Sequence, residues 1–150
     1  MSRTSLLTPG RLAVRLFAAV VCALVVGCGG SKRPTPVPVG GQILVNGTPY
    51  PGVQVTFVPL SGDATETLRP SAFTDGEGKF RLSSYSSGDG APEGEYAVLV
   101  AYRPLVGRGD EAQPGPNVLP ARYADPASSP LKVQVSRDNP DLGPLQITLR

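Results

Sequence analysis

From residue 37 onward the sequence alternates apolar and polar residues over many short stretches. In the first stretch four apolar residues share one parity: Val37, Val39, Ile43 and Val45. Successive side chains of a strand point to opposite faces, so this period predicts a strand with one apolar face. Val53, Val55 and Phe57 repeat the pattern, and the Asn46-Gly47 pair between the two stretches favours the positive φ angles of a turn between antiparallel strands.

Further alternating stretches follow along the chain. They lie at 72–74, 79–82, 95–102, 131–135 and 145–149. All of them are short, and Gly, Pro, Asp and Asn separate them, as expected for strands joined by turns. Strands that each bury one face need a second sheet to cover that face. The sequence therefore predicts an all-β fold, a seven-stranded antiparallel sandwich.

The N-terminus has the layout of a secretory signal. The run 16–26 is apolar and uncharged, and it follows directly on Arg15. A helix that spans a bilayer needs about 20 apolar residues, so this run is short for a permanent membrane anchor, which is the alternative interpretation. We expect residues 1–27 to be a signal peptide that is removed.

The run ends in Val25-Val26-Gly27-Cys28, which resembles the lipobox of bacterial lipoproteins. The resemblance implies cleavage before Cys28 and attachment of lipid to its thiol, which reacts as the thiolate. Several acyl chains on one residue exceed what stable anchoring requires, so we expect a membrane-bound protein. Residues 28–38 mix Gly and Ser with Pro and predict a tether. In lipoproteins an acidic residue directly after the cysteine favours retention in the inner membrane. Gly29 stands at that position here, which favours the outer membrane.

Length, charge and cysteine count exclude several classes of protein. The chain has 150 residues, enough for one domain, and a formal net charge of +2. Arg3, Arg11 and Arg15 precede the apolar run, and without them acidic residues slightly outnumber basic ones, so we expect no nucleic-acid partner. Cys22 and Cys28 both belong to the signal region, so we expect no structural disulfide.

Four segments resemble, in order, the motifs of carboxypeptidase regulatory-like domains. They are GQILVNGTP at 41–49, GVQVTF at 52–57, TDGEGKFRL at 74–82 and PEGEYAV at 92–98. The resemblance implies a seven-stranded Greek-key sandwich of the transthyretin (prealbumin) type, which we expect over residues 39–150. It also implies a binding, spacing or stabilising role rather than catalysis.

The chain lacks histidine, the commonest general base and zinc ligand, so we expect no enzyme and no cofactor. Ser129 and Lys132 have the spacing of serine acyl-enzymes, but the alternation places Lys132 on a strand, where the pair does not converge. Asp75 and Glu77, with Asp63 or Asp89, are weak candidates for calcium ligands. Turn chemistry explains the Asp75-Gly76 pair equally well.

The longest connection between predicted strands, 103–130, holds six prolines: Pro104, Pro114, Pro116, Pro120, Pro126 and Pro130. Loops beyond about 12 to 15 residues without structure of their own are usually functional or disordered. We expect residues 118–120 and Tyr123 to pack on the sandwich and 107–116 to be freer. Arg108, Asp110 and Tyr123 are the candidate contacts of a partner loop. A variable, solvated loop is the alternative.

These features together predict a non-enzymatic lipoprotein of the cell envelope, periplasmic or surface-exposed, held to a membrane by lipid on Cys28. Its sandwich is expected to serve as a structural or protein-interaction module. The alternative is an accessory domain that binds peptide or carbohydrate, so the partner is an envelope protein or a glycan. Against a sugar-stacking surface, the chain has no Trp, and several of its aromatic residues share the inward parity.

Overall fold

The computed structural model describes residues 33–61 and 68–149. The chain divides into two compact units between Arg33 and Pro34, and the second unit, 34–150, holds all the elements described below. The predicted signal peptide, the predicted lipidation site Cys28 and the calcium candidate Asp63 lie outside the described residues. Within the described ranges, no helix is long and apolar enough to cross a bilayer.

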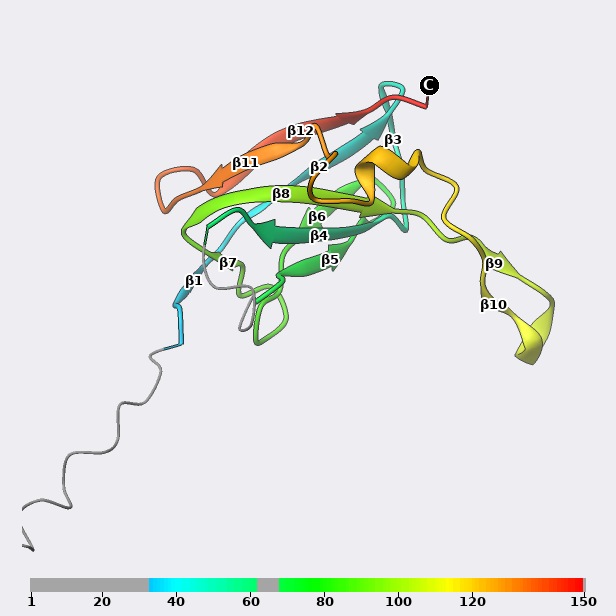
Figure 1. The fold of residues 1–150 in the computed structure, drawn as a ribbon. Coiled ribbons are helices and arrows are strands. Elements are labelled where there is room, and N and C mark those ends of the chain that lie inside the picture. Colours follow the sequence, from blue (N-terminus) through cyan, green and yellow to red (C-terminus); the bar gives the residue numbers. More distant parts are fainter. Residues whose placement is uncertain (1–32, 62–67, 150) are drawn as a thin grey trace, which may run out of the picture. The chain divides into compact units, whose positions relative to one another are not determined.

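The described chain is all-β, and two main sheets form a sandwich (Figure 1). The first sheet is antiparallel and has the order β11 (Lys132–Val135), β8 (Gly94–Ala101), β4 (Gln54–Pro59), β5 (Ser71–Phe73). The second sheet is built around β2 (Gly40–Val45), with β12 (Asp141–Ile147) on one side and both β3 (Thr48–Pro49) and β6 (Lys79–Arg81) on the other.

The core lies between the two sheets and uses the inward positions that the alternation predicts. Its largest fully buried side chains include Ile43 and Ile147 from the second sheet and Phe57 from the first. The ring centroid of Phe57 lies 6.3 Å from that of Phe80 and 5.6 Å from that of Tyr96. Large aromatic side chains contribute much of the buried area of such a core. The two sheets are therefore held together mainly by apolar burial.

Every stretch with strand-like alternation contains a strand, but the prediction of a wholly antiparallel sandwich was wrong at one pair. Strand β12 runs parallel to β2, with Leu145 opposite Ile43. It also begins at Asp141, earlier than the predicted start at 145, because a register shift beside Gly143 (φ +67°) interrupts the alternation. Alternation shows which face of a strand is buried; it does not show which strand lies beside it or in which direction.

The predicted tether, 28–38, also extends too far toward the C-terminus. Strand β1 (Pro36–Val37) pairs with β7 (Ala91–Pro92), and the side chain of Val37 is buried in the core. Gly90 (φ +94°) packs so closely that a Cβ there would collide with the carbonyl oxygen of Val37. Residues from Pro36 onward thus belong to the sandwich.

Candidate functional site

The connection between β8 and β11, expected to be one long loop, has two different halves. Residues 103–116, here called the arm, fold into a hairpin of β9 (Leu105–Val106) and β10 (Gln113–Pro114), with a 3-10 turn, η2 (Gly109–Glu111), between them. Residues 117–130, here called the strap, return along the sandwich and contain the 3-10 turn η3 (Ala121–Tyr123). The connection that was predicted as a loop thus contains two short paired strands and two 3-10 turns.

A single side chain closes the base of the arm. The Asn117 carbonyl oxygen Oδ1 accepts hydrogen bonds from the backbone N–H of Tyr102 (2.9 Å) and of Leu119 (3.1 Å). The backbone N–H of Val118 donates to the Tyr102 carbonyl at 3.0 Å. These bonds fix the point where the arm leaves β8, so the arm projects from a defined position.

The strap is packed on the sandwich, as the sequence predicted for Tyr123. Leu119, Tyr123 and Ser129 are buried, and the Ser129 hydroxyl donates to the Val98 carbonyl at 2.7 Å. The Tyr123 hydroxyl accepts the N–H of Thr148 at 3.1 Å; this bond lowers the pKa of Tyr123 below its usual value, with a smaller contribution from Arg122.

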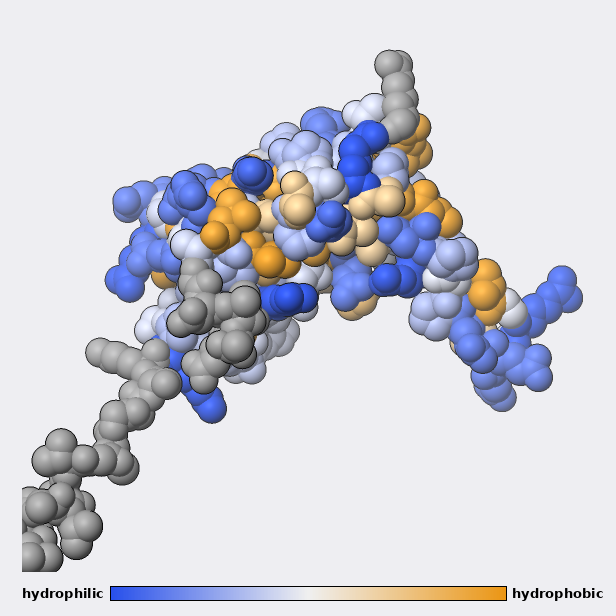
Figure 2. Space-filling model, viewed as in Figure 1, coloured by the Kyte–Doolittle hydropathy of each residue, from blue (hydrophilic) through white to orange (hydrophobic). Residues whose placement is uncertain are grey.

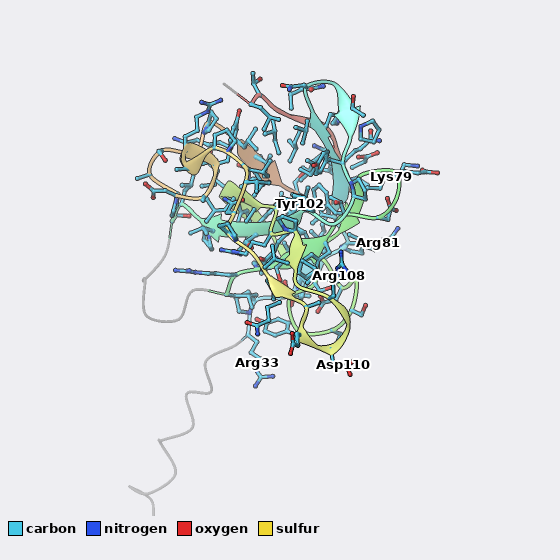
Figure 3. The ribbon with its side chains drawn as sticks, turned by 90° about the vertical axis from the view of Figure 1, so that its right-hand side faces the viewer. Arg33, Lys79, Arg81, Tyr102, Arg108 and Asp110 are labelled. Carbon is cyan, nitrogen blue, oxygen red and sulfur yellow. The ribbon has the colours of Figure 1, made fainter. Side chains whose placement is uncertain are left out.

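Tyr123 therefore differs from the two other candidate contacts of the partner loop. Its side chain is only 4% exposed, so it fastens the strap and offers no surface to a partner. Val118 was expected to pack on the sandwich but is exposed. Arg108 and Asp110 lie on the arm and are exposed, as Figure 3 shows with the arm facing the viewer.

The arm buries none of its residues, although it carries apolar side chains. Leu105 is 70% exposed and Val106 is 52% exposed. Figure 2 shows hydrophobic atoms on the arm beside the hydrophilic residues of its tip. A two-stranded hairpin is at best marginally stable in water, and this one gains no core contact. The arm is therefore the described element whose apolar residues are best placed to contact another molecule.

The turn that holds the calcium candidates is organised by its own hydrogen bonds. Asp75 Oδ1 accepts the backbone N–H groups of Glu77 and Lys79, both at 2.9 Å, and the Glu77 carboxylate pairs with the Lys79 ammonium at 2.6 Å. Glu77 raises the pKa of Lys79 through this contact. No group of three potential metal ligands occurs among residues 33–61 and 68–149.

The further calcium candidate, Asp89, serves a different loop. Its carboxylate accepts backbone N–H groups from Ser84 (2.6 Å), Tyr85 (3.0 Å) and Ser86 (2.9 Å). These donors lower the pKa of Asp89, with the Ser84 bond the largest cause. Asp89 therefore organises the 83–90 loop, and the structure does not bring it together with Asp75 in a cluster of ligands.

Comparison with known proteins adds little to this geometry. No family model matches the sequence, and neither does any curated protein. A solved structure with some similarity is that of a 9R-lipoxygenase from Cyanothece PCC8801, at 15% identity and a TM-score of 0.42. The match covers 91% of this chain and 20% of the lipoxygenase chain. A similarity at this TM-score supports no inference about the activity of this chain.

Proposed function

We propose that this protein is a non-enzymatic lipoprotein of the cell envelope, acylated on Cys28, whose sandwich presents the arm to a protein partner. The observation that carries the proposal is the arm itself, which projects from a fixed base and exposes Leu105 and Val106. Apolar residues on a projecting element are typical of contact sites, because burying them on a partner removes them from water.

The positions of β1 and the arm support this assignment. Within the 34–150 unit they lie at opposite ends (Figure 1). Cys28 precedes Pro36 by eight residues, a length that spans at most about 28 Å when extended. Lipid on Cys28 would hold the β1 end of the sandwich within that distance of the bilayer. The arm would then be available on the side away from the anchor.

We also propose that the sandwich is a carboxypeptidase regulatory-like domain with the Greek-key order of transthyretin. The support is the match between motif and structure at two places. The 74–82 motif forms a turn followed by β6, and the 92–98 motif forms the entry to β8. At that entry the Tyr96 hydroxyl donates to the Pro92 carbonyl at 2.9 Å, which ties the two ends of the motif together.

Photo-crosslinking in intact cells tests the role of the arm. A photoreactive residue at Leu105 is expected to give a discrete adduct with one envelope protein. The same residue at Leu149, which is exposed outside the arm, is the matched control and is expected to give none. Equal adducts from both positions, or none from Leu105, would contradict the proposal.

A further inference from the structure

A groove of about 880 Å³ lies on the outer face of the second sheet, on the side away from the core. The outward residues of β6, β2 and the first half of β12 line it, and Phe73 at the end of β5 forms part of its wall. Its volume is within the range of sites that bind small molecules, about 300 to 1,000 Å³. No residue of the arm lines it.

The floor of the groove is bare backbone. Gly40 in β2 is paired with Arg81 of β6 on one side and with Asp141 of β12 on the other. A Cβ on Gly40 would lie 2.6 Å from the carbonyl oxygen of Phe80, so the close approach of β6 requires glycine here. Gly41 and Gly143 also line the floor. A Cβ on Gly143 would meet nothing within 4 Å, so a flat ligand can approach the sheet at this position.

Apolar residues line the groove on more than one side. The side chain of Phe73, at the wall beside β6, is 69% exposed, and Pro140 and Pro144 line the groove from the side of β12. The parity of aromatic residues predicted a poor stacking surface, but Phe73 points outward from β5, opposite Gln54. This wall can take the apolar C–H face of a ring.

The groove carries charges of both signs. Lys79 and Arg81 face Asp75 and Asp141, and Figure 3 shows the two cationic residues on the same side of the sandwich. Within the described residues Arg81 has no ion pair, and Asp141 uses only Oδ1, which accepts the N–H of Gly143 at 2.9 Å. Because Lys79 is already paired with Glu77, Arg81 is the cationic donor and Asp141 the acidic acceptor best placed to bind a ligand in the groove.

We propose that this groove binds a neutral saccharide. Sugar hydroxyls both donate and accept, so different hydroxyls of one saccharide can bind the guanidinium of Arg81 and the carboxylate of Asp141, which lie on either side of Gly40. The C–H face of a pyranose ring packs on Phe73, and the glycine floor lets the ring approach the sheet. An anionic or a cationic ligand gains less, because each meets groups of both signs. This inference goes beyond the proposed role of the arm and does not depend on the anchor.

Calorimetric titration of the full chain, purified from whole-cell extract in a zwitterionic detergent without sugar headgroups, tests the proposal. The probes are maltohexaose, cellohexaose and chitohexaose. At least one of them is expected to bind with a dissociation constant of about 1 mM or tighter. Phe73→Ala is expected to weaken this binding at least about tenfold. Leu105→Ala, exposed on the arm, is the control and should bind as the wild type does.

Because Phe73 is exposed, its replacement is expected to leave the thermal unfolding midpoint unchanged, which separates loss of binding from loss of fold. Absence of saturable binding by all three sugars overturns the proposal. So does undiminished binding by Phe73→Ala. Hexaglutamate or hexalysine binding more tightly than every sugar also overturns it, because charge would then select the ligand.

Discussion

Replacing Thr74 with valine removes one hydroxyl from the interior of the sandwich and keeps the shape of the side chain. That hydroxyl donates to the Tyr50 carbonyl at 2.7 Å and accepts the N–H of Val53 at 2.8 Å. Thr74 is buried, and Val53 is fully buried. The variant therefore leaves the Val53 N–H without a partner and without access to water.

An unsatisfied buried donor destabilises a protein by about 1 to 3 kcal/mol. Tyr50 is only partly buried, so water can in part replace the bond to its carbonyl. We expect Thr74→Val to lower the free energy of unfolding by about 2 kcal/mol. For a domain of this size that lowers the midpoint of thermal unfolding by roughly 10 °C.

The assay is thermal and urea unfolding followed by circular dichroism. Thr48→Val makes the same substitution at an exposed position and is expected to stay within about 0.5 kcal/mol of wild type. Thr74→Ser keeps the hydroxyl, so its free energy of unfolding should fall much less than that of Thr74→Val. If Thr74→Val unfolds at the same temperature as Thr48→Val, the account of the two buried hydrogen bonds is wrong.

Three further predictions concern the loops. Replacing residues 104–116 by a short Gly-Ser linker should change the free energy of unfolding by less than about 1 kcal/mol, since the arm buries nothing; a larger loss in urea unfolding would show that it supports the fold. Gly90→Ala should destabilise the domain by more than about 2 kcal/mol in the same assay, because β1 cannot stay against the new Cβ; near-wild-type stability would refute this packing. The pKa of Asp89 is lowered by folding, so its stabilising effect is present above its unfolded value near 4 and is lost as the pH falls through the folded value. Asp89→Asn should therefore unfold with less acid dependence below pH 4 than wild type, and identical acid profiles would exclude this role.

The sequence was most informative where burial decides the structure. Alternation located the main strands and the inward positions, because one face of each strand must leave water. It did not reveal that β12 lies parallel to β2, since both directions bury Ile147 equally well. The boundary of the tether was missed for a related reason: Val37 is held by its pairing with Ala91, more than fifty residues away in the chain.

The candidate sites were harder to predict, because they depend on contacts between distant residues. The sequence around Tyr123 does not distinguish a side chain that faces solvent from a buried one. In the structure its hydroxyl accepts the N–H of Thr148. The arm needs the Asn117 side chain to fix its base, and no local pattern reports that contact. The groove depends on Gly40 lying between two strands that are far apart in the sequence.

Mass spectrometry of the N-terminal tryptic peptide from the membrane fraction tests the proposal that lipid on Cys28 tethers the sandwich to a membrane. We expect a peptide that begins at Cys28, ends at Lys32 and carries the mass of a diacylglyceryl group. A peptide that begins upstream of Cys28, or an unmodified Cys28 thiol in membrane-bound protein, would contradict it.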